Sequence, residues 1–171
     1  MTIHVETPTA GSGTMDDLQF CSIMRATAAS VMVITTGYNG QLHGMTATAF
    51  SSVSAEPPTV LIVLNRSTRT HPMVSASGHF VVNLLAEDQA HLGNRFAGKL
   101  DNQFDGIGYT LSDRGAPIIN GAVATLECET VGATDFGTHT IFIGKVLKGT
   151  RSEVLPLLYH DGGYKGITRR G

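Results

Sequence analysis

Small side chains at residues 46–49 form the first pattern in this chain that could do chemistry. Thr46 and Thr48 are two residues apart, so on an extended strand both side chains point to the same face. Ala47 and Ala49 alternate with them, and such short side chains let a planar ring lie close to the strand. Hydroxyl and backbone N–H groups can bond to the polar edge of the ring and stabilise negative charge that develops on it. An ordinary strand is the alternative interpretation, because threonine is common in strands.

Anion-binding groups follow at residues 65–70, which read Asn-Arg-Ser-Thr-Arg-Thr and precede a possible helix. The hydroxyls of Ser67 and Thr70, charge from Arg66 or Arg69, and the first N–H groups of that helix could hold a phosphate. The sequence leaves open which arginine points inward. A solvated loop with two surface arginines is the alternative. Together the two patterns suit a flat, mostly apolar molecule with a polar edge and a phosphate tail, and a flavin nucleotide is such a molecule.

Strands dominate the elements that must position these groups. Residues 31–36 are a β-branched run, and Asn39-Gly40 is a strong hairpin signal. Further strands are expected at 42–53, 59–64, 80–85, 122–131, 138–147 and 157–160, and helices at 18–28, 70–77 and 87–96. This order lacks the regular alternation of strand and helix that a parallel sheet requires. The pattern predicts a mainly β fold, an antiparallel barrel with peripheral helices.

Length and composition bound the class of protein. The 171 residues, 42% of them hydrophobic and 15% charged, predict one domain at 15–171 after a flexible N-terminal tail at 1–14. A net charge of −2 without a basic block argues against a nucleic-acid surface. The seven histidines lack metal-ligand spacing, so no metal site is expected. Cys21 and Cys128 are far apart and are predicted to be reduced, buried thiols.

Targeting signals are absent from the printed sequence. It shows no basic segment followed by an apolar run and no apolar stretch as long as a membrane span. These features predict a cytoplasmic protein without a membrane partner. The sequence also lacks the G-x-x-x-x-G-K-[ST] phosphate loop, the G-x-S-x-G nucleophile elbow and the G-x-G-x-x-G dinucleotide motif. Any nicotinamide nucleotide would therefore bind in an open groove and not in a Rossmann domain.

Eight short segments resemble the flavin reductase family that supplies reduced flavin to two-component monooxygenases. The resemblance covers about residues 18–166, and the order and spacing of the segments make it specific. The matching segments are VMVITT (31–36), GMTATAFSSVS (44–54), EPP (56–58), LNRS (64–67), FVVNLL (80–85), RFAG (95–98), GTHTIFIGKV (137–146) and PLLYH (156–160).

The resemblance implies a split β-barrel with Greek-key strands that works as a homodimer. It implies reduction of FMN or FAD by NADH or NADPH, with direct hydride transfer from nicotinamide C4 to flavin N5 and no protein nucleophile. The reduced flavin would pass to a separate oxygenase. The predicted flavin-binding residues are Thr46, Ala47, Thr48, Ala49, Leu64, Asn65, Arg66, Ser67, Thr70, Phe96, Lys99 and Tyr164. Another FMN-binding split-barrel oxidase, or a barrel that binds flavin without catalysis, remains the alternative.

His139 is the predicted catalytic residue, as part of a nicotinamide pocket formed by residues 137–140. Relatives usually carry Gly-Asp-His-Thr here, whereas this chain has Thr138 in place of the aspartate. A carboxylate could orient the imidazole or raise its pKa, and a hydroxyl lacks the charge to do so. His139 is expected to position the nicotinamide or the flavin edge. A structural histidine on a strand is the alternative.

Three predicted flavin contacts carry alternatives of their own. Phe96 and Lys99 lie in a region that closes over the flavin in relatives, but a core phenylalanine and a cation at a helix C-terminus would look the same. Tyr164 could belong to the cofactor rim, across a dimer interface, or to ordinary packing. Gly162-Gly163 is interpreted as a turn.

Overall fold

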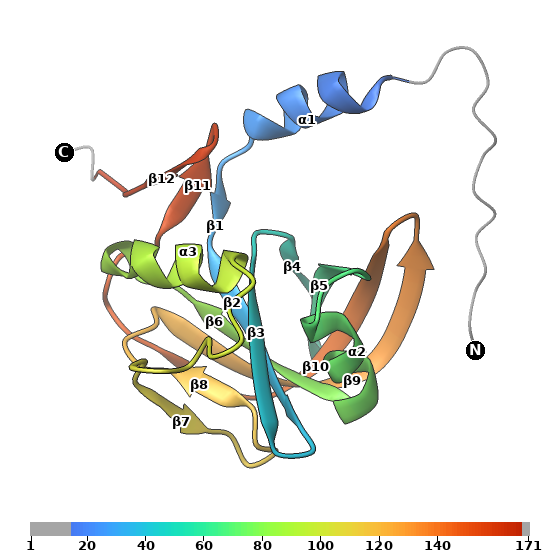
Figure 1. Ribbon diagram of the computed structural model, residues 1–171, viewed down its shortest axis with the longest axis vertical. Helices are drawn as coiled ribbons and strands as arrows, with labels where there is room; N and C mark the ends of the chain where they lie inside the picture. The colour runs from blue at the N-terminus through green and yellow to red at the C-terminus, as the bar shows by residue number, and fades with distance from the viewer. Residues whose placement is uncertain (1–14, 169–171) are drawn as a thin grey trace.

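The computed structural model describes residues 15–168, so the predicted tail at 1–14 lies outside the described part. A seven-stranded antiparallel sheet forms the body of the molecule, in the order β3-β2-β6-β9-β10-β5-β4 (Figure 1). Its strands are β2 (Met32–Tyr38), β3 (Gln41–Ala47), β4 (Phe50–Ala55), β5 (Pro58–Asn65), β6 (His79–Leu84), β9 (Ala124–Phe136) and β10 (His139–Arg151). The mainly β fold predicted from the sequence is confirmed.

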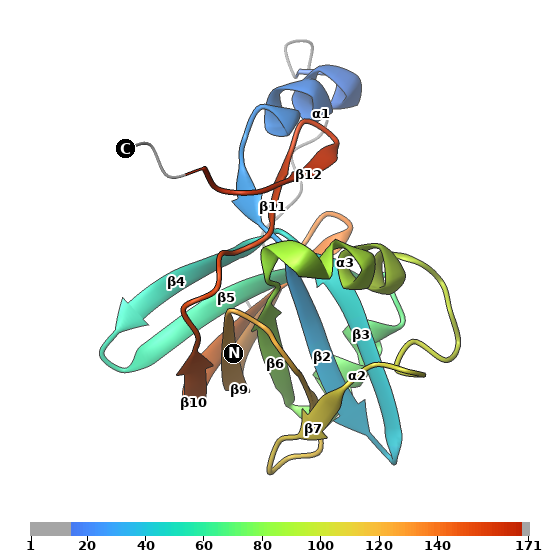
Figure 2. The same cartoon turned by 90° about the vertical axis from the view of Figure 1, so that its left-hand side faces the viewer.

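The sheet must curl, because β3 and β4 are its two edges yet adjoin in the chain. Residues 48 and 49 alone separate them, and the step from Ala47 to Phe50 spans at most roughly 11 Å. Six flat strand spacings would be roughly 29 Å. The two edges therefore meet, and Figure 2 shows β4 and β5 diverging from β2 and β3 away from this point. This is the geometry of a barrel split at a seam, and residues 46–49 lie at the seam.

The single return strand predicted at 42–53 is wrong. Residues 41–47 pair with β2, whereas residues 50–55 pair with β5. The chain changes partner at Thr48-Ala49, where Ala49 O accepts a hydrogen bond from Val63 N at 3.2 Å. No glycine or proline marks the change, so the sequence offers no local signal for it.

Short elements cover the ends of the barrel. The helices are α1 (Asp17–Arg25), α2 (Thr70–Ser77) and α3 (Ala90–Ala97), and α3 follows a 3-10 turn at Glu87–Gln89. There are also two small sheets. One consists of β1 (Ala29–Ser30), β11 (Leu158–His160) and β12 (Gly163–Lys165), and the other of β7 (Tyr109–Leu111) and β8 (Pro117–Ile119). Of the turn expected at Gly162-Gly163, only Gly162 lies in a turn, because β12 begins at Gly163.

Two buried clusters hold the barrel together. The larger fills the barrel interior from β2, β5, β6, β9, β10 and α2, and includes Leu64 and Phe142. The smaller lies under α3 and includes Phe96 and Leu157. Cys128 belongs to the larger cluster, and burial raises its pKa to about 12. Cys21 lies exposed on α1, so its predicted burial is wrong. No residue of α1 is buried, because this helix stands away from the sheet (Figure 1).

Candidate functional site

Two cavities adjoin the C-terminal half of β3 and share Thr46 and Ala97 in their linings. The first, called the arginine cavity, has a volume of about 550 Å³. Its lining residues are His43, Gly44, Met45, Thr46, Ser67, Thr68, Arg69, Thr70, Phe96, Ala97, Gly98, Lys99 and Gln103. The second, called the tyrosine cavity, has a volume of about 460 Å³. Its lining residues are Val31, Thr46, Ala47, Thr48, Asn94, Ala97, Tyr159, Gly162, Gly163 and Tyr164. Both volumes lie in the range of small-molecule sites.

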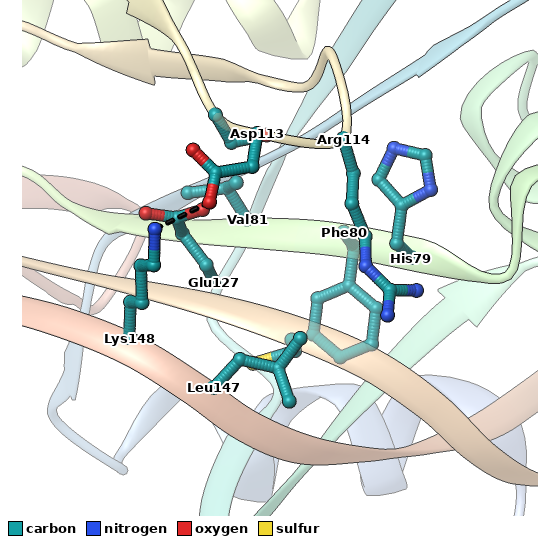
Figure 3. A pocket seen from close by; sticks show the side chains of 10 residues that line it. His79, Phe80, Val81, Asp113, Arg114, Glu127, Leu147 and Lys148 are labelled. Carbon is teal, nitrogen blue, oxygen red and sulfur yellow. Dashed lines mark hydrogen bonds and ion pairs between the residues drawn. The ribbon is translucent and has the colours of Figure 1, made fainter.

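A smaller cavity between β6, β9 and β10 differs from these two in size (Figure 3). Its volume is about 60 Å³, far below that of a nucleotide site. Lys148 and Asp113 form an ion pair beside it, and both side chains are exposed. This cavity cannot hold a flavin.

Eight of the predicted flavin contacts line one of the two large cavities. Ser67, Thr70, Phe96 and Lys99 line the arginine cavity, Ala47, Thr48 and Tyr164 the tyrosine cavity, and Thr46 both. Ala49, Leu64, Asn65 and Arg66 line neither. The side chain of Leu64 is wholly buried in the core, so only its backbone could reach a ligand.

The open edge of β3 brings polar backbone groups to the cavities. Within the described sheet β3 has a neighbouring strand on one side only. Gly44 N points away from β2 and donates to Gln103 Oε1 at 3.1 Å. Because alternate residues of a strand direct their N–H groups to the same side, the N–H of Thr46 faces the same open edge. The Thr46 hydroxyl donates to Gly93 O at 2.7 Å and ties β3 to α3.

Phe96 supports the floor of the arginine cavity. A Cβ atom placed on Gly44 would lie 2.9 Å from its ring, so only glycine lets the ring approach β3 this closely. The Phe96 side chain is 2% exposed and packs edge-on against Phe104 at 5.1 Å between centroids. Phe96 is therefore a core residue, and the edge of its ring also reaches the cavity wall.

The turn after β5 organises itself before any ligand binds. Asn65 Oδ1 accepts hydrogen bonds from Ser67 N at 2.9 Å and from Ser67 Oγ at 2.8 Å. Thr68 Oγ1 donates to Asn65 O at 2.8 Å. This side-chain turn presents Ser67 and the start of α2 to the arginine cavity. Asn65, which lines neither cavity, thus shapes the turn from behind.

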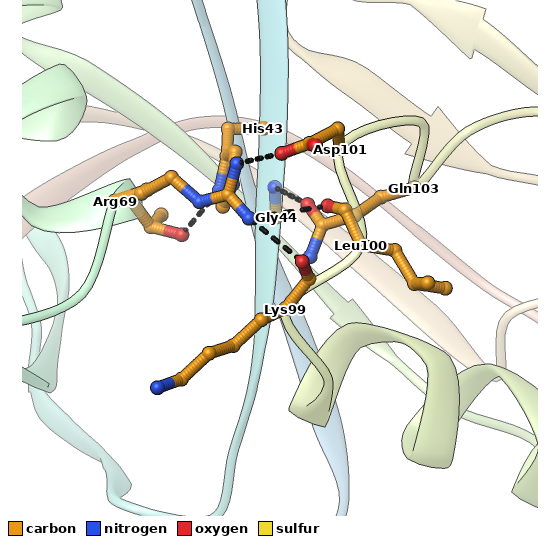
Figure 4. A network of polar contacts seen from close by, with 8 residues as sticks. His43, Gly44, Arg69, Lys99, Leu100, Asp101 and Gln103 are labelled. Carbon is orange, nitrogen blue, oxygen red and sulfur yellow. Dashed lines mark hydrogen bonds and ion pairs between the residues drawn. The ribbon is translucent and has the colours of Figure 1, made fainter.

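The two arginines of this turn point to different places. Arg69 lines the arginine cavity, where it pairs with Asp101 Oδ1 at 2.5 Å and donates to Lys99 O at 2.9 Å (Figure 4). Arg66 instead donates to Gly137 O at 2.7 Å and lies 3.6 Å from Asp135. Arg69 is therefore the arginine that faces the cavity, a choice that the sequence left open.

His43 and Gln103 are cavity residues that sequence reasoning missed. His43 Nδ1 shares a hydrogen bond of 2.8 Å with the buried Thr70 hydroxyl, while its buried Nε2 has no partner among the described residues. Burial, and then the charge of Arg69, lower the pKa of His43, so the imidazole is neutral at pH 7. A single histidine on a strand and a glutamine in a loop give no sequence signal. Only the packing of the 98–105 loop against β3 reveals them.

His139 lies outside the linings of both cavities. It is exposed at the start of β10, opposite Asn65 of β5 in the strand register. Its Nδ1 lies 2.9 Å from Thr138 Oγ1. Thr138, which stands where the aspartate was expected, therefore makes an orienting hydrogen bond to the imidazole without a charge.

A hydrogen-bond chain fixes the strand next to His139. Thr140 Oγ1 donates to Asp135 Oδ1 at 2.5 Å and lies 2.7 Å from His71 Nε2. Because the Thr140 proton goes to Asp135, His71 Nε2 must be the donor in the second bond. Burial lowers the pKa of His71, Asp135 raises it in part, and Arg66 lowers it further. These hydrogen bonds link the first turn of α2 to the end of β9 and the start of β10.

Tyr164 forms one wall of the tyrosine cavity. A Cβ atom placed on Gly93 would lie 2.6 Å from Tyr164 Oη, so the phenol rests directly on α3. The ring of Tyr159 meets it edge-on at 5.7 Å. Burial, and then Tyr159, raise the pKa of Tyr164.

Across residues 15–168 no group of three His, Cys, Asp or Glu residues is arranged to hold a metal ion. Nor does any helix in that range have the length and apolar character needed to cross a membrane.

Comparison with known proteins gives consistent matches. A family model described as flavin reductase like domain matches residues 24–168. The reductase component of an FADH(2)-dependent resorcinol hydroxylase from Rhizobium sp. is 39% identical over 157 residues, which are 89% of this chain and 88% of that protein. An FMN reductase (NADH) from Agrobacterium fabrum is 33% identical over 167 residues, 98% of this chain and 93% of that protein. A Streptomyces globisporus NADH:FAD oxidoreductase, solved with NAD and FAD fragments, has a TM-score of 0.86 at 34% identity, covering 90% of this chain and 93% of that chain.

Proposed function

Since the chain belongs to the flavin reductase-like domain family, we propose that it reduces free flavin with NADH or NADPH and releases it to a separate oxygenase. The observation that carries this proposal is the meeting of the arginine and tyrosine cavities at Thr46. One offers anion-binding groups, and the other offers small side chains beside aromatic rings. Of the proteins named above, one is an FMN reductase that uses NADH, one is an NADH:FAD oxidoreductase, and one is the reductase component of an FADH(2)-dependent hydroxylase.

The residues of the arginine cavity fit the phosphate end of a flavin nucleotide. Ser67 and Thr70 bring hydroxyl groups and Arg69 brings a guanidinium, which are strong partners for phosphate oxygens. The unpartnered Nε2 of the neutral His43 could form a hydrogen bond with a ligand hydroxyl, which can either donate or accept. We therefore assign the phosphate arm of the flavin to this cavity.

The ring of the flavin is assigned to the seam along Thr46, Ala47 and Thr48. These side chains are short, and the Thr46 N–H lies on the open edge of β3. When bound, the flavin supplies the hydride-accepting ring. The protein contributes donors along its polar edge, which favour the reduced ring as negative charge builds up. His139 pairs with Asn65 in the strand register. Together with its hydrogen-bond partner Thr138, it would orient the nicotinamide.

A spectrophotometric assay tests the function. NADH or NADPH oxidation is followed with FMN, FAD or no flavin added, and the preferred pair identifies both substrates. The proposal predicts steady nicotinamide oxidation that depends on added flavin. Oxidation of another substrate by tightly bound FMN would point to a split-barrel oxidase. Flavin binding without nicotinamide oxidation would point to a non-catalytic barrel, and either result would contradict the proposal.

The predicted homodimer is supported by the exposed apolar face of α1. Phe20 is 56% exposed, Ile23 52% and Met24 46%, and their helical spacing places these three side chains on one side of α1. Contiguous exposed apolar patches mark interaction surfaces, and we propose that a second copy of the chain covers this one. Light scattering after gel filtration should give twice the chain mass. Phe20→Glu should shift the mass toward the monomer, whereas Ser22→Glu, on the opposite side of the same helix, adds the same charge and should not.

The predicted location stays a proposal of the same kind. A cytoplasmic protein would have direct access to the nicotinamide nucleotides that the proposed reaction consumes. Fractionation of the producing cell, with the chain detected by antibody, should place it with the cytoplasmic enzymes. Recovery in another compartment would contradict this.

A further inference from the structure

Arg69 lies between two cavities. Besides the arginine cavity it lines a neighbouring one of about 570 Å³, called the outer cavity, together with His43 and Asp101. His43 and Arg69 are the residues that the two linings share. The position of the guanidinium therefore decides how the two spaces connect.

Asp101 and the 98–105 loop hold that guanidinium in place. Nη1 of Arg69 pairs with Asp101 Oδ1 at 2.5 Å, and Nη2 donates to Lys99 O at 2.9 Å (Figure 4). The loop itself is anchored independently, because Arg95 Nε donates to Gln103 O at 2.7 Å and Gln103 Oε1 accepts from Gly44 N at 3.1 Å. Asp101 can release Arg69 while the loop remains attached to β3.

The ion pair is open to solvent and weak. The Asp101 side chain is 94% exposed and that of Arg69 51% exposed. Exposed pairs of this kind contribute little, because water screens them and both side chains lose freedom. A phosphate dianion carries more charge than a carboxylate and can take two guanidinium N–H groups at once. A phosphate that binds beside Ser67 would therefore displace the Asp101 carboxylate from the Arg69 guanidinium.

We propose that Asp101 is an internal competitor for Arg69 and thereby sets how strongly the site selects phosphorylated flavins over unphosphorylated ones. This inference rests on the proposed function. In the free protein the carboxylate occupies the guanidinium. Binding of the phosphate displaces the carboxylate, and Arg69 turns from the outer cavity wall toward Ser67. Asp101 acts through Arg69, so it is a specificity-determining residue and not a catalytic one.

The test compares Asp101→Asn with the native chain by quenching of flavin fluorescence. The variant should bind FMN about two- to fivefold more tightly, the range that an exposed ion pair allows. It should bind riboflavin, which has no phosphate, with unchanged affinity. Asp113→Asn is the matched control, because it removes the same charge from another exposed ion pair on the far cavity of Figure 3. The control should alter neither affinity.

Three results would overturn the inference. FMN affinity of Asp101→Asn could be unchanged, it could fall, or riboflavin affinity could rise by the same factor. A second measurement needs no flavin: inorganic phosphate is titrated while the Arg69 Nε–H resonance is followed by NMR. The resonance should shift at lower phosphate concentration in Asp101→Asn than in the native chain. If phosphate shifts the Arg69 resonance as expected but no flavin binds, the proposed function is contradicted, whereas the displacement of Asp101 by phosphate is supported. If the phosphate response is the same in both proteins, the displacement is contradicted.

Discussion

Arg66 donates a hydrogen bond from Nη2 to the carbonyl oxygen of Gly137 at 2.7 Å, which fixes the turn after β5 to the turn before β10. One turn carries the predicted phosphate contacts, and the other carries His139. The Arg66 ion pair with Asp135 and the hydrogen bond from Thr140 to Asp135 reinforce this link. The two halves of the proposed site are therefore held in register by side chains that line neither cavity.

The two arginines of residues 65–70 should have separable effects. Arg69→Ala should weaken FMN binding about tenfold or more, because a hydrogen bond to a charged group contributes about 1.5–3 kcal/mol. Arg66→Ala should leave FMN affinity nearly unchanged and raise the KM for NADH, because the turn before His139 loses its hydrogen bond from Arg66 to Gly137 O. Fluorescence titration and steady-state kinetics measure the two effects. Equal losses of FMN affinity in both variants would contradict the assignment.

His139 should affect hydride transfer more than flavin binding. His139→Ala is expected to slow turnover without abolishing FMN binding, since the imidazole is assigned to the nicotinamide side. Thr138→Val, which removes the 2.9 Å partner of Nδ1 but keeps the shape, should cause a smaller loss in the same direction. Stopped-flow reduction of bound flavin by NADH measures both. Full turnover with unchanged nicotinamide affinity in His139→Ala would show that the role is wrong.

Gly44 should be intolerant of a side chain. Gly44→Ala places a Cβ atom 2.9 Å from the Phe96 ring, and the resulting overpacking should cost about 1–3 kcal/mol of unfolding free energy. Displacement of Phe96 should also weaken FMN binding. Gly132→Ala is the control, because its nearest neighbour, Ile143, lies at an ordinary 3.7 Å. Urea denaturation compares them, and equal stability of the two variants would contradict the packing described.

The neutral His43 should make stability depend on pH. The pKa of His43 lies below the ordinary 6.5, mainly because the imidazole is buried. Below pH 6.5 the unfolded chain therefore binds a proton at this residue more readily than the folded chain does. Stability is then fully present above pH 6.5 and falls as the pH is lowered. His43→Gln should flatten this fall between pH 6.5 and 5, leaving the part due to His71. Urea denaturation across that range measures the slope, with the exposed His91→Gln as control. A slope unchanged by His43→Gln would refute the prediction.

Local sequence patterns were sufficient to predict the class of fold and the turn that lines one side of the arginine cavity. The β-branched run at 31–36, the Asn39-Gly40 turn and the hydroxyl-rich residues 65–70 lie where they were expected, and the predicted family, fold and enzyme class are confirmed. The change of partner strand at Thr48-Ala49 escaped prediction because it depends on how the sheet closes. The same holds for His43, Gln103 and Asp101, which reach the cavities only through tertiary packing. Which arginine faces inward depends on Asp135 and Asp101, both remote in sequence.

A crystal structure of the chain with bound FMN would test the central claim most directly. The phosphate should lie within hydrogen-bond distance of Ser67 and Arg69, with Asp101 displaced. The ring should lie along Thr46, Ala47 and Thr48 at the seam between β3 and β4. A ring bound away from that seam, or no bound FMN in crystals grown at saturating concentration, would contradict it.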